Sequence, residues 1–361
     1  MSVLDLARPH LRGLKPYRPA RGFGVEGETF LDANESPRAL SEDGALAGLN
    51  RYSPPQPAAL VREAARFYGV PADHVVVTRG ADDGIDLLVR AFVEPGREGI
   101  AVLPPTYGLF ATTARLHGCA VREAPLDAAR GFALVPERVL AAAAGPVKLA
   151  FVCRPNNPTG TVAPLDDVEA LAAGLSGRAL VVVDEAYIEF SEAASAATLV
   201  ARRPNVVVLR TLSKAWALAG ARVGFLIATP EVAALMQTLR TPYPFSGPAV
   251  RAAESAFNAA GEAAMRRSVA SIRAERARLA ARLGSLRGVS EVLPSEANFL
   301  VARLRDKGAA LAALRARRIV VHDRGSDLGL GDAVRITVGL PEENDRLLAA
   351  LDARDGERPT P

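Results

Sequence analysis

The sequence predicts an α/β protein: a large domain with a mostly parallel seven-stranded sheet, followed by a smaller α+β domain. Between residues 74 and 228, short apolar runs recur between Gly- or Pro-bearing turns and helical patterns, an order typical of a parallel sheet with helices on both faces. After residue 245 the character changes to one long helical pattern and a few short strands. We therefore expect an N-terminal arm over 1–30, a large domain over 31–245 and a C-terminal domain over 246–361 that packs with the arm.

The composition is that of an ordinary globular protein. Of the 361 residues 49% are hydrophobic and 23% are charged, with a formal net charge of +4. No apolar run approaches the ~18 residues that a membrane helix needs, and the first eight residues hold an acid and a base where a signal peptide is apolar. The basic residues are spread out, which disfavours nucleic-acid binding. Two cysteines and four scattered histidines predict neither disulfides nor a metal site. We expect a cytoplasmic protein without membrane contact.

The large domain is predicted element by element from its apolar periodicity. A short strand starting at residue 30 runs into a turn, and an amphipathic helix over 57–68 ends at Gly69. A strand over 74–78 leads through a Gly-bearing turn into a helix that reaches Phe92. Further strands are expected over 100–103, 147–153, 179–183, 206–209 and 223–228. The run 179–183 has almost no polar residue, which predicts burial on both faces.

The C-terminal domain is expected to begin with a single helix over 248–286, whose arginines mark a solvated face. Its last helix is expected to start at Pro341, because proline is well placed in a first turn. Between these two helices we expect one more helix over 308–317 and strands over 289–292, 299–302, 319–321 and 334–338.

A lysine follows one of the buried strands. Lys214 comes just after the run 206–209, where open α/β sheets keep their ligands, and Ser213 and Arg222 nearby suit a phosphate group. A lysine beside a phosphate-binding pair is what a pyridoxal phosphate enzyme needs, because the amine forms a Schiff base with the cofactor. Taken alone, the Ser-Lys pair also fits a solvated loop.

A second anion site is predicted where Gly80, Ala81 and Asp82 open a helix directly after a strand. The first amides of a helix are unpaired and its dipole favours negative charge. Asp82 has a simpler alternative role, as a charge that complements the start of the helix.

Other polar residues also stand at the ends of predicted strands. Because these ends lie at one edge of a parallel sheet, we expect the residues to form one active site. The set comprises Gly80, Ala81, Asp82, Tyr107, Asn157, Asp184, Tyr187, Ser213, Lys214 and Arg222.

Several short motifs also carry a family resemblance over nearly the whole chain. They lie at residues 14–17, 31–37, 78–85, 155–160, 183–187, 211–214, 218–224 and 335–339. In these motifs the chain resembles the fold-type I pyridoxal phosphate aminotransferases of class II, and most closely the histidinol-phosphate aminotransferases.

The resemblance implies a role for each residue around the cofactor. Lys214 would form the Schiff base with pyridoxal 5′-phosphate and move the proton at the substrate, and Asp184 would pair with the ring nitrogen. The remaining contacts fall into three groups: a phosphate site at Gly80, Ala81, Asp82, Ser213 and Arg222, hydrogen bonds to the ring oxygen from Asn157 and Tyr187, and stacking by Tyr107. Tyr52 would reach the phosphate from a neighbouring subunit, which implies a homodimer with shared active sites.

The resemblance also implies how small-molecule substrates bind. Arg335 would bind the carboxylate of the amino donor, with Tyr17 and Asn34 near the substrate. The family usually carries an arginine for the substrate phosphate where this chain has His322, and Arg324 stands two residues on. Either Arg324 takes over that role, or the second substrate carries no phosphate.

The expected reaction is amino transfer from histidinol phosphate to 2-oxoglutarate, giving imidazole acetol phosphate and glutamate in histidine biosynthesis. An aromatic amino acid aminotransferase of the same family is the alternative that His322 favours. A threonine-phosphate decarboxylase and a non-catalytic binding module are further alternatives, although intact Lys214, Asp184 and Arg222 argue against the last.

Overall fold

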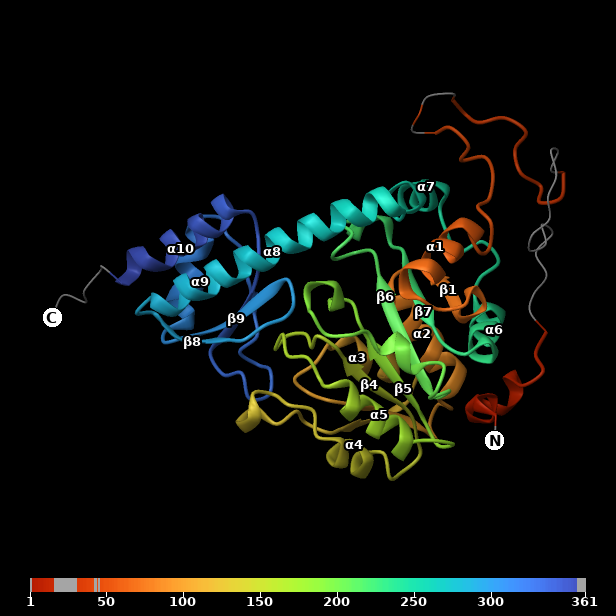
Figure 1. Cartoon of the computed structure of the whole chain (residues 1–361), viewed down its shortest axis with the longest axis horizontal. Coiled ribbons are helices and arrows are strands. Elements are labelled where there is room, and N and C mark those ends of the chain that lie inside the picture. The colour runs from red at the N-terminus through yellow and green to blue at the C-terminus, as the bar shows by residue number, and fades with distance from the viewer. Residues whose placement is uncertain (1, 16–30, 42–43, 45, 356–361) are drawn as a thin grey trace.

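A computed structural model describes residues 2–15, 31–41, 44 and 46–355, with the backbone alone at 353–355. Its strands form two sheets, one of seven strands in the order β1-β7-β6-β5-β4-β2-β3 and one of four in the order β10-β11-β9-β8. Figure 1 shows the larger sheet surrounded by helices and the smaller sheet lying to one side, with the long helix α8 reaching from one to the other.

The larger sheet confirms the predicted fold class. Five of its strands, β2 to β6, run parallel to one another, whereas β7 is antiparallel to both β6 and β1. Its strands are β1 (Val75–Thr78), β2 (Gly99–Val102), β3 (Ala120–Glu123), β4 (Val147–Cys153), β5 (Leu180–Asp184), β6 (Val206–Thr211) and β7 (Gly224–Ile227). The edge strand β3 was not predicted, because three of its four side chains are exposed and it has no apolar run.

Both faces of this sheet are buried, as the apolar strands predicted. In β5 the side chain of Val182 packs with residues of α2, α3 and α6, whereas Val181 and Val183 pack with residues of α4 and α5. This division follows from the alternation of side chains along a strand. The helices of this part are α1 (Ala58–Tyr68), α2 (Ala81–Phe92), α3 (Leu109–Leu116), α4 (Pro136–Ala142), α5 (Leu165–Gly174) and α6 (Pro230–Leu239).

The described part of the arm corrects one expectation. Its 3-10 helices η1 (Val3–Leu6) and η2 (Pro9–Leu11) lie against the larger sheet's helices, far from the smaller sheet (Figure 1). The Arg8 amide donates to the Ala91 carbonyl at 2.9 Å, and its guanidinium pairs with Glu94 at 3.0 Å. The packing on the C-terminal domain that we expected is therefore wrong for residues 2–15, because Leu6 and Leu11 are buried in the core beside α2 and α6. Residues 31–34 form no strand, against expectation.

The C-terminal part of the chain begins with two helices, although a single helix over 248–286 was expected. α7 (Gly247–Ala256) ends before Phe257, whose ring is buried against Trp216 and Phe225, and α8 (Ala259–Ser285) starts after Asn258. The Asn258 side chain caps α8 by accepting from the amides of Ala260 and Gly261 at 3.1 and 3.0 Å. A buried aromatic and a capping residue thus interrupt a periodicity that looked continuous.

The smaller sheet is antiparallel throughout. The expected strand over 319–321 is absent from this described stretch, and pairing begins instead at the next residue, where His322 lies opposite Arg335. The remaining elements are β8 (Val289–Leu293), β9 (Phe299–Leu304), α9 (Lys307–Ala316), β10 (His322–Asp323), β11 (Ala333–Thr337) and α10 (Pro341–Asp355). Within the described ranges no helix has both the length and the apolar character to cross a membrane.

We predict that Asn258→Ala lowers the free energy of unfolding by about 1 kcal/mol, because two amides at the start of α8 lose their acceptor. Denaturant unfolding followed by circular dichroism measures this change. Asn258→Asp keeps the capping oxygen and loses only the amide that donates to the Ser255 carbonyl at 2.8 Å, so this control should lose less stability than Asn258→Ala. Equal loss in both variants would contradict a capping role.

Candidate active site

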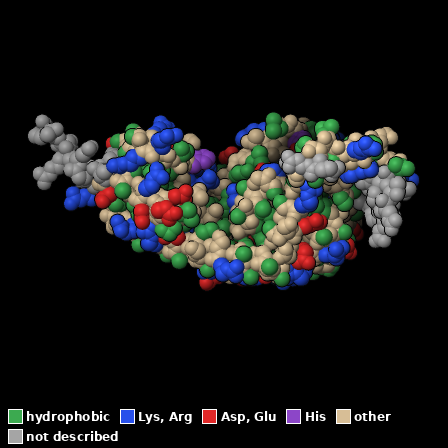
Figure 2. Space-filling view, turned by 90° about the horizontal axis from the view of Figure 1, so that it is seen from above, with side chains coloured by type: hydrophobic (Ala, Val, Ile, Leu, Met, Phe, Trp, Pro, Cys, Tyr) green, Lys and Arg blue, Asp and Glu red, His purple; other side chains and the backbone are tan. Residues whose placement is uncertain are grey.

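All the residues predicted from strand ends, except Gly80, line one cavity of about 460 Å³. It lies at the carboxyl ends of β4, β5 and β6, beside the start of α2, and is closed on one side by β10 and β11. In the space-filling view the surface is hollowed between the smaller and larger parts of the molecule (Figure 2). The predicted residues that line the cavity are Ala81, Asp82, Tyr107, Asn157, Asp184, Tyr187, Ser213, Lys214, Arg222, His322, Arg324 and Arg335.

One end of the cavity is built for an anion. Arg222 Nη1 donates to Ser213 Oγ at 3.1 Å, and its Nη2 pairs with Asp82 Oδ2 at 3.2 Å. Gly80 precedes the first turn of α2, and no side chain caps this helix. A Cβ on Gly80 would come within 2.7 Å of Arg222 Nη2, and its φ of +85° also suits glycine. A hydroxyl, a guanidinium and uncapped helix amides therefore meet at one point.

Asp184 lies at the other end, as the last residue of β5. Its side chain is buried, and burial raises its pKa to about 7, although a hydrogen bond from the Ala186 amide at 3.1 Å opposes the rise. Within the described residues this amide is the one hydrogen-bond donor to the carboxylate. A buried carboxylate with so few partners is suited to a cationic N–H group in the cavity.

Lys214 lies between these two ends, three residues after β6. Its Nζ is 5.6 Å from the ring centre of Tyr187. Burial lowers the pKa of Lys214, and the guanidinium of Arg335 lowers it further, whereas Asp82 and Asp184 act in the opposite direction. The net effect increases the fraction of the amine that is free of its proton near neutral pH.

Three neutral polar side chains line the cavity between Lys214 and Arg335. Asn157 Nδ2 donates to Tyr187 Oη at 3.4 Å, and Tyr107 Oη donates to Asp82 Oδ1 at 3.2 Å. Burial raises the pKa of both tyrosines, so their hydroxyls stay protonated and can donate hydrogen bonds. Arg335 in turn donates to Asn157 Oδ1, which links the smaller sheet to this wall.

The pairing of β10 with β11 builds the cationic side of the cavity. Arg335 Nη2 lies 3.4 Å from Nδ1 of His322, and Arg324 Nη1 lies 3.3 Å from its Nε2. Arg324 also forms an ion pair with Asp327. Burial lowers the pKa of His322, as do the two neighbouring guanidiniums, so its imidazole is favoured in the neutral form.

Two described site residues, Tyr52 and Asn34, are not brought into this cavity. Tyr52 is about half exposed and stacks on Tyr243 with ring centres 4.2 Å apart. Asn34 is exposed and is not among the lining residues. Tyr17 lies outside the described residues. A single copy of the chain therefore does not join Tyr52 or Asn34 to Lys214.

Two features near the cavity are not predicted from the sequence. Cys153 lines the cavity, and its position at the end of β4 was a signal that could have found it. Behind the cavity, the buried side chains of Arg154, Glu185 and Arg210 form an ion-pair cluster. No periodicity in the sequence distinguishes a charged residue that lines a cavity from one that belongs to a buried ion pair.

Comparison with known proteins agrees with this geometry. The sequence pattern of the family "Aminotransferase class I and II" matches residues 29–351. A histidinol-phosphate aminotransferase of Stenotrophomonas maltophilia (strain R551-3) is 47% identical over 354 residues, covering 98% of this chain and 97% of that protein. One of Xanthomonas campestris pv. campestris is 45% identical over 355 residues, with 98% of each covered.

A solved structure shares the fold as well. The histidinol-phosphate aminotransferase of Sinorhizobium meliloti, crystallised in complex with pyridoxal-5′-phosphate, superposes with a TM-score of 0.75 at 27% identity, covering 85% of this chain and 83% of that one. The near-complete coverage by both sequence and structure confirms the resemblance stated above. The chain belongs to the class I and II aminotransferases and, within them, to the histidinol-phosphate aminotransferase family.

Proposed function

We propose that the chain binds pyridoxal 5′-phosphate and transfers the amino group of histidinol phosphate to 2-oxoglutarate, giving imidazole acetol phosphate and glutamate in histidine biosynthesis. The observation that carries this proposal is the convergence of Lys214, Asp184 and Arg222 on one cavity. Relatives that share 45–47% identity over nearly the whole chain carry the name of this activity.

The residues present fit the cofactor at both of its charged ends. The uncapped start of α2, together with Ser213 and Arg222, would hold the phosphate. The buried carboxylate of Asp184 would accept a hydrogen bond from the ring nitrogen and favour its protonated form. When bound, pyridoxal phosphate supplies an aldehyde that takes up amino groups and a ring that accepts electrons from the substrate's Cα.

Lys214 is the residue that we assign to proton transfer. Its amine lines the cavity, and the lowered pKa increases the fraction of the amine that is free of its proton and can act as a base. Tyr187 and Asn157, bonded to each other, would donate to the ring oxygen of the cofactor. Tyr107 would cover the ring from the side of α3.

Arg335 is the residue that we assign to the carboxylate of the amino acid. It is directed into the cavity by its bond to Asn157, and its planar guanidinium can bind a carboxylate through two parallel hydrogen bonds. His322 and Arg324 extend this cationic side, where the phosphate of the substrate would lie. Because His322 favours the neutral form, an aromatic amino acid as substrate is the second candidate.

We further propose that two copies of the chain share their active sites and that the enzyme is cytoplasmic. The half-exposed Tyr52 lies outside its own cavity, which is where a residue serving a second copy would lie. Asn34 would act in the same way. We assign residues 31–245 to a cofactor-binding domain and 246–361 to a smaller domain.

We predict that Lys214→Ala lowers multiple-turnover transamination by at least about a thousandfold, because proton transfer at the substrate loses its base. Glutamate release from histidinol phosphate and 2-oxoglutarate is the measurement. Lys148→Ala, at a lysine that pairs with Glu98 away from the cavity, is the control and should retain activity. Near-normal turnover without Lys214 would exclude the proposed mechanism.

We predict that a single turnover of the loaded enzyme is much faster with histidinol phosphate than with phenylalanine, because Arg324 and Arg335 provide two cations for the doubly charged phosphate, whereas phenylalanine offers a single carboxylate. Stopped-flow absorbance of the bound cofactor follows both reactions. A comparable or faster reaction with phenylalanine would identify the aromatic amino acid aminotransferase as the true function.

We predict that chains carrying Tyr52→Ala and chains carrying Lys214→Ala, each weakly active alone, recover activity when they are mixed and allowed to exchange. A mixed dimer would contain one site with both Tyr52 and Lys214 intact, so up to about a quarter of the parent activity is expected from statistical mixing of equal amounts. Activity assays before and after mixing test this, and a mixture no more active than the average of its components would count against shared sites.

A further inference from the structure

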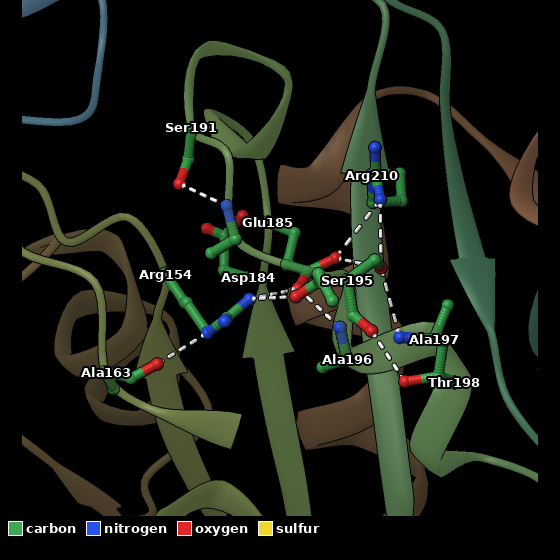
Figure 3. A network of polar contacts seen from close by, with 12 residues as sticks. Arg154, Ala163, Asp184, Glu185, Ser191, Ser195, Ala196, Ala197, Thr198 and Arg210 are labelled. Atoms are coloured by element: carbon green, nitrogen blue, oxygen red, sulfur yellow. Dashed lines mark hydrogen bonds and ion pairs between the residues drawn. The ribbon is translucent and has the colours of Figure 1, made fainter.

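Behind the cavity, four charged side chains are buried together with no bulk solvent around them. Arg154 is 2% exposed, Glu185 is fully buried and Arg210 is 4% exposed. Glu189 completes the group, and its side chain is 6% exposed. Figure 3 shows the carboxylate of Glu185 between the two guanidiniums. Because two arginines meet two glutamates, the formal charges of this cluster cancel.

Both carboxylate oxygens of Glu185 accept hydrogen bonds from neighbouring residues. Its Oε1 accepts from Arg154 Nη1 at 3.1 Å and from the Ala196 amide at 2.7 Å. Its Oε2 accepts from Arg210 Nη1 at 3.1 Å and from the Ser195 hydroxyl. Removing one partner of a buried, fully bonded charge leaves the other uncompensated.

The two arginines fix the neighbouring strand ends. Arg154 follows β4, and its amide donates to the Asp184 carbonyl at 2.7 Å, while its guanidinium also donates to the carbonyls of Ala163 and Ala194. Arg210 belongs to β6 and pairs through Nη2 with Glu189 at 2.7 Å. The cluster thus ties the ends of β4, β5 and β6, the three strands that lead to Asn157, Asp184 and Lys214.

Glu185 and Asp184 are consecutive, so their side chains point to opposite faces of the sheet. Asp184 lines the cavity, whereas Glu185 enters the cluster. The two carboxylates are nevertheless close enough to repel each other in a region of low dielectric constant, and the pKa of Asp184 is raised in part by Glu185. The arginines offset that repulsion.

From this arrangement we infer that Glu185, Arg154 and Arg210 are positioning residues for Asp184: they hold its backbone in place and balance the charge beside it. The inference rests on the proposed function, because Asp184 acts there as the partner of the cofactor's ring nitrogen. Other groups that face Asp184 are Asp82 from α2, Cys153 from β4, Tyr107, Tyr187 and Lys214. None of them belongs to the cluster, so the tests below leave them unchanged.

The test uses two variants that change the cluster's charge in opposite directions. Glu185→Gln leaves one excess positive charge beside Asp184, and Arg154→Gln leaves one excess negative charge. The probe is pyridoxine 5′-phosphate, which has the ring nitrogen and the phosphate but no aldehyde to react with Lys214. Its affinity for the cofactor-free protein is measured across pH through the fluorescence of Trp216, the single tryptophan.

In the parent protein we expect affinity to fall as the pH drops through about 7, where Asp184 takes up a proton. Asp184 has a raised pKa, so its ionised form is populated above that value and lost below it. Glu185→Gln should move this midpoint to lower pH and Arg154→Gln to higher pH. Each shift should be about one pH unit, as for one charge at roughly 10 Å with an effective dielectric constant near 20. Arg154→Lys, which keeps the charge, should stay near the parent midpoint.

Opposite shifts would support the inference, because a purely structural role would weaken binding in both variants without moving the midpoint in opposite directions. Shifts of the same sign, or none, would overturn it while leaving the proposed function standing. A parent protein that does not bind pyridoxine 5′-phosphate at all would overturn both. If Glu185→Gln does not fold, Glu189→Gln adds the same charge at the edge of the cluster and replaces it in the test.

Discussion

The parallel pairing of β4, β5 and β6 is the constraint on which the site depends. The register sets Cys153 opposite Asp184 and Asp184 opposite Leu209, so three strands end at nearly the same level. Each strand is mostly apolar and almost entirely buried, and the residues that line the cavity lie at or after its carboxyl end. Backbone hydrogen bonds between these strands therefore fix the positions of the residues at their carboxyl ends. Short loops after the strands are enough to bring the side chains that line the cavity together.

The site also depends on burial, which acts differently on its members. Low exposure raises the pKa of Asp184 and lowers that of Lys214, and both shifts weaken the charge that each group would carry in water. In a cavity that binds a charged cofactor, a carboxyl group with a raised pKa and an amine with a lowered pKa are suited to exchange protons. Arg222 and Arg335, at opposite ends of the cavity, provide cations for two separate anions.

Much of the fold and of the candidate site could be predicted from the sequence. Strands such as 179–183 are short, uniformly apolar runs, and residues directly after them have few places to go other than the sheet edge. Lys214, Asp184 and Arg222 were found in this way. The resemblance to a known family added Arg335, whose strand is too short and too mixed to be assigned to the cavity from its pattern alone.

Other features depend on contacts that periodicity does not encode. The break between α7 and α8 follows from a buried ring at Phe257 and a cap at Asn258. The described part of the arm lies against the helices of the larger sheet because Leu6 and Leu11 are buried beside α2 and α6. Tyr52 and Asn34 are separated from the cavity in one chain, and a pattern along a single sequence cannot tell residues of one copy from those of its neighbour.

The helix α8 belongs to two cores at once. Met265 and Val269, in its first half, pack with Trp216 and Phe299, whereas Leu279 and Leu283, in its second half, pack with the smaller sheet and α10. One continuous helix of 27 residues therefore joins the part of the chain that carries Lys214 to the sheet that carries Arg335. We expect a change of packing in either core to alter the distance between the amine of Lys214 and the guanidinium of Arg335 without touching either one.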